Sequence, residues 1–398
     1  MKLSLRRLEE IFCAGGKPSS ESADFRALTV QMAKPDALKS EFLSAEEAGL
    51  SPFLKIRSAI FRGNLHSARE SLFKLQPDGS AEFLVESKVE AARLACFEGD
   101  WQVALRLTDE TFELGPSPLN RLTLHQIRGT AFFVREEFTS AYQEWQLAKS
   151  FEFAYPNAQS AFYIRVLGAR LQVRMRGATA GRKALDELWK ELSGSELNRD
   201  HLLSVLRIEL ELCNFQGNSG MHLAIACFVV AQAMGDNLYR DLALVEIYSF
   251  ADSLLKTHLK AFVEEATRRF KRVSLELERA FLENRQKSAV SVEEFESLIS
   301  STLVAVPRFG YVFDIFQSET LCLKPESRAN QALEVARFRR MKKSEFFKHL
   351  WGKQHYSSRL HDRLIWTVLS RLRKSCRIEC KCEDDQIKFQ GLVVLSEI

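Results

Sequence analysis

The stretch Met341–Leu395 decides the fold of the C-terminal part of the chain. It reads MKKSEFFKHLWGKQHYSSRLHDRLIWTVLSRLRKSCRIECKCEDDQIKFQGLVVL. The pattern predicts a short helix ending at Leu350-Trp351-Gly352, a polar turn, a long basic helix, and two strands around the acidic turn Glu383-Asp384-Asp385. We therefore expect a small α+β module in the order helix, turn, helix, hairpin.

The long basic helix has two chemically different faces. With Arg359 as origin and about 100° per residue, Leu364, Ile365, Val368 and Leu372 fall near the opposite side of the helix. The residues within about 40° of Arg359 are polar, basic or aromatic: Arg363, Trp366, Ser370 and Arg373. Arginine neutralises phosphates and pairs with guanine edges. We expect these five residues and Lys374 to contact a polyanion, with Lys342 and Lys343 as additional backbone contacts. Trp366 has a second interpretation, in which it packs over the hairpin.

The run Leu369-Ser370-Arg371-Leu372-Arg373-Lys374, after a helix that closes on Leu350-Trp351-Gly352, resembles the winged-helix effector domain of OmpR-type response regulators. The resemblance covers residues 311–398, with a small hairpin over 311–316 and 320–323 and a helix over 328–339 before the module above. It implies that the long helix is a recognition helix and that double-stranded DNA is the partner. Because one such domain binds weakly, it also implies a homodimer on a repeated site.

Two features depart from that family. The turn Glu383-Asp384-Asp385 is acidic where the family has a basic or neutral tip, and Gly391-Leu392 stands where the family has a Gly-Tyr pair. A phosphate backbone repels acidic residues, so either the hairpin points away from DNA or the module no longer binds it. No receiver domain with a phosphorylatable Asp is evident, so we expect control to come through the helical repeats.

Charge is distributed unevenly along the 398 residues. Between Lys324 and Lys381 there are 16 Lys and Arg against 5 Asp and Glu, whereas the remainder has 40 against 47. A basic segment attached to an acidic body is typical of a polyanion-binding module. The alternative is a solvated basic surface that binds nothing.

Composition limits the cellular context. No apolar run approaches the roughly 20 residues that a membrane span needs. The N-terminus MKLSLRRLEEIFCAGG has charges among its apolar residues, unlike a signal peptide. Single cysteines within apolar patterns suggest reduced, buried thiols. We expect a cytoplasmic protein, with residues 1–50 forming a partly flexible arm.

An internal repeat begins at Ser51. The motifs Gly63-x-Leu65-x-x-Ala68, Gly99-Asp100-Trp101-x-x-Ala104 and Glu136-Glu137-Phe138-x-x-Ala141 place their alanines 36 and 37 residues apart. This spacing is close to the 34-residue period of tetratricopeptide repeats, which the segment 51–156 resembles. The resemblance implies a concave groove, and Arg57, Arg93 and Gln126 fall at first-helix positions that line it. We expect them either to bind the carboxylates of a protein or peptide partner or to be solvated surface residues.

The repeat pattern continues after residue 156, but its spacing is less regular. Helical pairs are predicted over 162–174 with 180–192, over 202–215 with 222–234, and over 241–255 with 261–284. One pair cannot bury its own apolar face, so an α-solenoid over 51–286 is expected. A linker helix within 287–310 would start at Ser291-Val292-Glu293-Glu294, where Ser291 accepts a free amide and Glu294 reaches back.

Patterns for catalysis and metal binding are weak. Cys376, Cys380 and Cys382 supply soft ligands, but they lack the paired Cys-x-x-Cys spacing of structural zinc, and on a strand they would share one buried face. No phosphate-binding loop, dinucleotide loop, nucleophile elbow or His-Glu-x-x-His is present. We expect no enzyme activity, no metal and no cofactor.

The sequence thus predicts a mainly α protein, with a TPR-like α-solenoid followed by an α+β winged-helix domain. The expected function is a DNA-binding transcriptional regulator whose repeats bind a protein partner or signal. The main alternative is a non-enzymatic scaffold that uses both parts for protein contacts, with the basic face meeting an acidic partner. RNA binding by the same face is a third possibility, although no RNA-binding motif is present.

Overall fold

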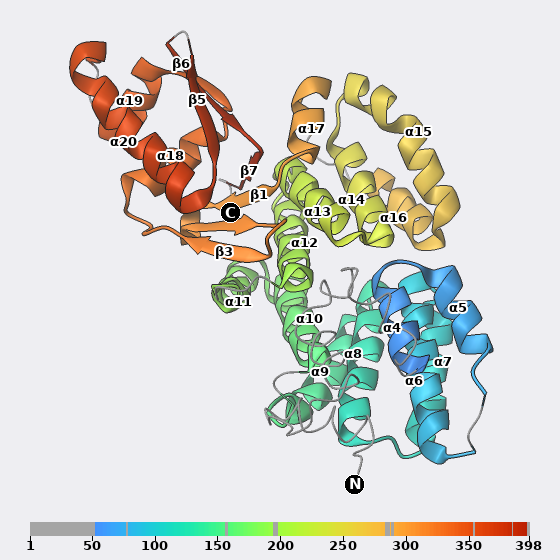
Figure 1. Cartoon of the computed structure of the whole chain (residues 1–398). Helices are drawn as coiled ribbons and strands as arrows, with labels where there is room; N and C mark the ends of the chain where they lie inside the picture. Colours follow the sequence, from blue (N-terminus) through green and yellow to red (C-terminus); the bar gives the residue numbers. More distant parts are fainter. Residues whose placement is uncertain are drawn as a thin grey trace. The chain divides into compact units, whose positions relative to one another are not determined.

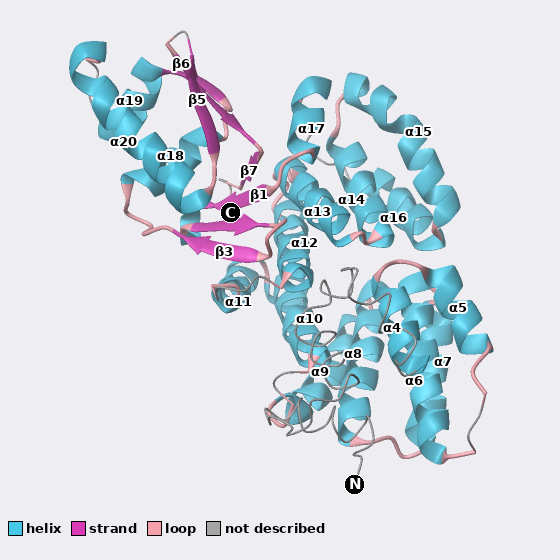
Figure 2. Cartoon of the chain, viewed as in Figure 1, coloured by secondary structure: helices cyan, strands magenta, loops and turns pink. Residues whose placement is uncertain are grey.

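The structure, a computed structural model, describes residues 52–76, 79–155, 158–193, 198–282, 287, 290–352, 355–383 and 385–395. The expected arm over 1–50 lies outside these residues. The described chain is mainly helical, and all of its strands follow Leu303 (Figure 2). The fold class predicted from the sequence is therefore confirmed: a helical array precedes an α+β module.

The chain divides into two compact units whose segments alternate along the sequence. The first contains the described residues up to Leu188, Met234–Leu242, and the described part of 262–283. The second contains Trp189–Ala233, Ala243–Ala261 and the described residues after 284.

The first unit starts with helices in consecutive pairs. Within it, α4, α6, α8 and α10 pack against one another in order, and each of α5, α7 and α9 packs on the helix before it. This is the stacking expected of a helical-repeat array. The helices are α4 (Pro52–Phe61), α5 (Leu65–Phe73), α6 (Ala81–Glu98), α7 (Trp101–Glu113), α8 (Pro118–Val134), α9 (Phe138–Glu152), α10 (Gln159–Arg176) and α11 (Ala178–Glu191).

The turns within the first three pairs share one geometry. Gly63, Gly99 and Glu136 occupy equivalent positions in the left-handed region, with φ of 68°, 84° and 63°. The amide after each bonds to a carbonyl five residues back, as in Asp100 N to Ala95 O at 2.8 Å. Such a helix ending favours glycine, so Glu136 is the strained member of the set. The alanines that define the repeat, Ala68, Ala104 and Ala141, are all fully buried where the helices cross.

The end of the array differs from the sequence prediction. Where two helices were expected, over 241–255 and 261–284, there are three: α14 (Asn237–Phe250), α15 (Ser253–Arg269) and α16 (Lys271–Leu282). The predicted break at 256–260 is wrong, because these residues lie inside α15. The Asp252 side chain accepts the Leu255 amide at 2.9 Å and so starts a new helix inside a continuous apolar pattern. The preceding pair, α12 (Arg199–Phe215) and α13 (Met221–Met234), lies close to its predicted bounds.

Late segments of the chain return to the first repeats within the first unit. Lys271 pairs with Asp100, and the Arg272 guanidinium lies 5.4 Å from the Trp101 ring and 5.7 Å from the Tyr239 ring. At Gly63 a Cβ atom would lie 2.7 Å from the Leu238 backbone nitrogen, so this approach requires glycine. The first repeats are therefore covered by residues about 170 positions later in sequence.

The second unit contains the C-terminal α+β module (Figure 1). A four-stranded sheet has the order β3-β2-β1-β7, with β7 parallel to β1, and a three-stranded sheet has the order β4-β6-β5. Its elements are α17 (Val292–Ile299), β1 (Leu303–Val306), η3 (Pro307–Phe309), β2 (Tyr311–Asp314), β3 (Glu319–Cys322), α18 (Arg328–Ala336), β4 (Arg340–Lys342), α19 (Lys343–Trp351), α20 (Ser358–Cys376), β5 (Glu379–Glu383), β6 (Gln386–Gln390) and β7 (Leu392–Val394).

The expected helix, turn, helix and hairpin are all present in the predicted order. The strands β1, β4 and β7 were not predicted, because β1 is a short apolar run without alternation and β4 and β7 have only three residues each. Ser291 accepts the Glu294 amide at 3.2 Å, as expected, and its hydroxyl donates to the Glu293 carboxylate at 3.0 Å.

Inside the second unit the module packs on part of the array. Trp189 is fully buried, stacks on Phe309 and Phe313 at ring distances of 5.7 and 6.0 Å, and donates its indole N–H to Glu209 at 2.7 Å. The Arg199 guanidinium donates to the Ile315 carbonyl at 2.9 Å. The four-stranded sheet is therefore joined to the start of α12 and the residues just before it.

Candidate nucleic-acid interface

Helix α20 is held against α19 by aromatic and polar contacts. Phe347 stacks on His361 with ring centroids 4.1 Å apart, and the Ser357 amide donates to His361 Nδ1 at 2.9 Å. Gly352 ends α19 in the left-handed conformation, with φ of 67°. These contacts fix where α20 begins and which way it leaves the turn.

Asp362 adds a second anchor at the same point. Its carboxylate accepts hydrogen bonds from the Tyr356 hydroxyl and from Lys343 Nζ, the latter at 3.1 Å. Burial opposes ionisation, but these two donors and the lysine charge hold the pKa of Asp362 below its usual range. The bond to Asp362 raises the pKa of Lys343. Lys343, predicted as a backbone contact, thus has an intramolecular carboxylate partner, whereas Lys342 is exposed.

The inner face of α20 belongs to the core of the module. Ile365, Val368, Leu369, Leu372 and Cys376 are all buried, in one cluster with side chains of α18, α19 and the hairpin. Leu364 differs from the expectation, because its side chain is 43% exposed. The buried direction lies about 90° further round the helix than Leu364, which places this residue on the rim.

The outer face of α20 carries unpaired cations. Arg359 and Arg363 are exposed, and neither side chain has a hydrogen-bond or ion-pair partner among the residues that the structure describes. The same holds for Lys374 and for Arg371, which the sequence analysis did not select. Arg371 was missed because the stripe was centred on Arg359. Arg371 lies about 120° from Arg359 and so fell outside that stripe. Ser370 is half-buried on this face.

Arg373 and Trp366 lie on the hairpin side of that face. The Arg373 guanidinium donates to the Cys380 carbonyl of β5, with Nε at 3.0 Å, and stands 5.4 Å from the Trp366 ring, which is 42% exposed. Both predicted residues are thus exposed, but Arg373 already joins α20 to the hairpin. Arg377, just after α20, pairs with Asp314 at 2.8 Å and Glu319 at 2.7 Å and joins the helix end to the other sheet.

A row of cations crosses the three-stranded sheet. Lys388 of β6 stands directly opposite Arg340 of β4 on one side and Lys381 of β5 on the other. Met341, Ile387 and Phe389 point to the buried face, so the row lies on the outer one. Like charges directly opposite each other destabilise a sheet. The acidic tip lies partly outside the described residues, and the Asp385 carbonyl accepts the Lys343 amide at 3.0 Å.

The three candidate residues of the repeats do not line an open surface together. Arg57 and Arg93 are buried, with Nε atoms 2.8 and 3.1 Å from the two carboxylate oxygens of Glu90, which is fully buried. Gln126 is half-buried and donates to the Thr130 hydroxyl at 3.2 Å. The expected groove arginines therefore neutralise an interior glutamate, and they are not available to a partner's carboxylates.

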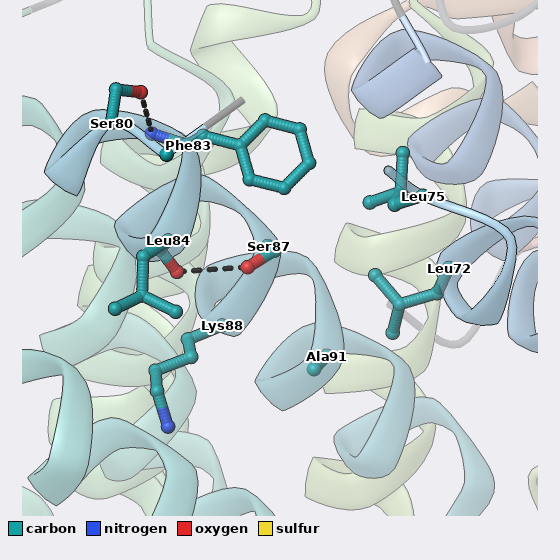
Figure 3. A pocket seen from close by; sticks show the side chains of 9 residues that line it. Leu72, Leu75, Ser80, Phe83, Leu84, Ser87, Lys88 and Ala91 are labelled. Carbon is teal, nitrogen blue, oxygen red and sulfur yellow. Dashed lines mark hydrogen bonds between the residues drawn. The ribbon is translucent and has the colours of Figure 1, made fainter. Parts of the chain in front are cut away.

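An apolar groove does exist between α5 and α6 (Figure 3). It encloses about 530 Å³, with Leu72 and Leu75 on one wall and Phe83, Leu84 and other α6 residues on the opposite wall. Ser80 caps α6 by accepting the Phe83 amide at 3.0 Å, and the Phe83 ring points across the groove toward Leu75 (Figure 3). This feature, rather than the arginines, is the candidate contact surface of the repeats.

The cysteines near the hairpin behave as buried thiols. Cys376 is the last residue of α20, and not on a strand as considered from the sequence, while Cys380 and Cys382 lie on β5. Burial raises the pKa of Cys376 to about 12. Among the described residues no group of three or more His, Cys, Asp or Glu side chains could hold a metal ion.

Comparisons with family models, with curated proteins and with solved structures returned no match to the chain. None of the helices in the described ranges combines the length and apolar character needed to cross a bilayer.

Proposed function

We propose that the C-terminal module binds double-stranded DNA through the outer face of α20 and that the protein is a DNA-binding transcriptional regulator. The resemblance of the module to OmpR-type winged-helix domains suggests the role of α20 as recognition helix. The observation that carries the proposal is the group of exposed cations on one face, Arg359, Arg363, Arg371 and Lys374, none with a partner in the described chain.

The lack of partners for these arginines within the described chain is informative, because the alternative is that each arginine serves the fold through an ion pair with a neighbouring carboxylate. Elsewhere in the module arginine is used structurally, as in the pairs of Arg377 with Asp314 and Glu319. On α20 the cations repel one another along about four helical turns and gain no compensating contact within the described part of the molecule. Phosphates supply that compensation, and the release of their counterions provides affinity.

The direct test is a titration of labelled duplex DNA at two salt concentrations. We expect affinity to fall steeply with salt, and the double variant Arg359→Ala/Arg363→Ala to bind more weakly, with the slope of log K against log salt reduced by about 2. The matched control is Arg106→Ala/Arg268→Ala, which removes the same charge from exposed sites on α7 and α15. Equal losses in both double variants would reduce the effect to net charge and remove the proposal.

The repeats are proposed to bind a protein partner through the apolar groove between α5 and α6. The support is that this groove is concave and apolar, encloses about 530 Å³ and has Lys88 in its lining. A photo-crosslinking amino acid placed at Ser87, on the groove wall, should give one discrete protein adduct in cells, and the same group at exposed Arg106 should not.

The second candidate function is a scaffold in which the face of α20 meets an acidic protein. It is favoured by one observation, the two exposed leucines Leu360 and Leu364 beside the cations. The salt titration separates the two functions, because the scaffold predicts no DNA affinity that depends on Arg359 and Arg363.

A further inference from the structure

Two leucines on the first turns of α20 are exposed to solvent. Leu360 is 70% exposed and Leu364 is 43% exposed. They are four residues apart, so they lie on one side of the helix about 6 Å apart along its axis. Leucines that are exposed next to each other, on a helix whose buried face is already complete, indicate a surface that another molecule covers.

The two leucines do not belong to the buried core of the module. The buried residues of α20, from Ile365 to Cys376, lie on a different side of the helix and already form one cluster with α18 and α19. Around the leucines lie instead Arg359, Arg363 and Arg371, which are exposed and unpaired within the described chain. Whatever covers the pair therefore has to offer apolar contact and negative charge together.

The major groove of DNA offers this combination. Its walls are phosphates, and its floor has one apolar group, the C5 methyl of thymine. In helix-turn-helix docking the N-terminal residues of the recognition helix reach the base edges, and Leu360 and Leu364 occupy that part of α20. A separation of about 6 Å along a helix lying in the groove matches about two base-pair steps of 3.4 Å.

We propose that Leu360 and Leu364 contact thymine methyl groups and make the binding site of this protein selective for thymine at two nearby positions. This inference rests on the proposed DNA-binding function and adds the base that is recognised. The arginines on either side bind the backbone and set the position of the helix. The leucines supply the discrimination between bases, since thymidine and deoxyuridine differ only in that methyl group.

The experiment replaces thymine by deoxyuridine. A preferred duplex is selected from a random pool with the full chain, and each thymine is then replaced singly. For the wild-type protein we expect about fourfold weaker binding at one or two positions, the value for one buried methyl-sized group, and no change at the others. In Leu360→Ala/Leu364→Ala the thymine and deoxyuridine duplexes should bind equally, with the salt dependence unchanged because no charge is removed.

Leu254→Ala is the matched control, because Leu254 is an equally exposed leucine on α15, at 67%. It should retain the wild-type ratio between thymine and deoxyuridine. Binding that is steeply salt-dependent but equal for both bases at every position overturns this inference and leaves the proposed function standing. Absence of salt-dependent binding overturns both. If the leucine variant keeps the wild-type ratio between thymine and deoxyuridine, the pair does not contact the thymine methyl group and the inference is overturned.

Discussion

Glu90 is fully buried between Arg57 and Arg93, so the free energy of its ionised form depends on two guanidinium groups. Burial alone would raise its pKa, but the charges and hydrogen bonds of Arg57 and Arg93 hold that pKa below the usual value of 4.5. A carboxyl whose pKa is lower in the folded state stabilises the fold above its unfolded pKa. The stabilisation is lost as pH falls through the folded pKa.

The first prediction concerns Glu90→Gln. At pH 7 this variant should be less stable by about 3 kcal/mol, because it leaves two buried guanidinium groups without a counter-charge. The difference from wild type should shrink as the pH falls through the lowered pKa of Glu90, because the folded wild-type protein then loses the same negative charge. Denaturant unfolding between pH 7 and pH 3 measures it. Glu113→Gln, at an exposed carboxylate, is the control, and a pH-independent difference for Glu90→Gln would contradict the assigned ion pairs.

The same residues show a limit of sequence analysis. Arg57 and Arg93 were placed correctly on first helices, α4 and α6, but their orientation depends on Glu90, which lies three residues before Arg93 and 33 after Arg57. A spacing of three on a helix indicates a possible pair, so half of the network was visible in the sequence. The other half, the pair of Arg57 with Glu90, joins neighbouring repeats, and no local sequence pattern predicts it.

At the scale of elements, the outer face of the three-stranded sheet places Lys388 between Arg340 and Lys381. Such a row costs stability, because each cross-strand pair of like charges is unfavourable. Arg340 and Lys381, at its two ends, are exposed and would face a phosphate backbone if the proposed interface extends to this sheet. Stability and DNA affinity should then change in opposite directions when one of these charges is removed.

The second prediction follows for Lys381→Gln. The variant should unfold at higher temperature, with a gain of about 0.2–1 kcal/mol, because one repulsive pair is removed. If the row contacts phosphate, the slope of DNA affinity with salt should fall by about 1. Lys348→Gln, an exposed lysine on α19 outside the sheet, should change stability by less than about 0.5 kcal/mol. A destabilised Lys381→Gln would show that the lysine has an attractive partner and that the row is not repulsive.

The order of elements in the module could be predicted because each long element has a strong local pattern. The apolar spacing of α20 and the glycine after α19 are sufficient for this. The direction of the buried face of α20 was less well determined, and Leu364 was placed inside because the wheel was centred on Arg359. The extra helix boundary at Asp252 was missed for a related reason: two adjacent helices with compatible periods appear as one, and only the capping aspartate separates them.

At the scale of the whole molecule, the chain passes between its two units several times. Met234–Leu242 and the described part of 262–283 belong to the first unit, whereas Ala243–Ala261 belongs to the second. No sequence pattern predicts this, because the contacts that define it, such as Lys271 with Asp100, join residues 171 positions apart. The stability of each unit therefore depends on contacts between segments that are far apart in the sequence, and each unit can be tested through one residue.

The last prediction compares Arg272→Ala with Trp189→Ala. Arg272 lies between the Trp101 and Tyr239 rings in the first unit, so its removal should cost about 2 kcal/mol through lost cation–π contacts and packing. Trp189 fills the core beneath Phe309 and Phe313 in the second unit, and its removal should cost about 3–5 kcal/mol. By hydrogen exchange, Arg272→Ala should expose amides of α6, α7 and α16 and leave α18–α20 protected, whereas Trp189→Ala should expose β1–β3 and leave α6 and α7 protected. Faster exchange throughout the chain in either variant would mean that the two units unfold as one cooperative body.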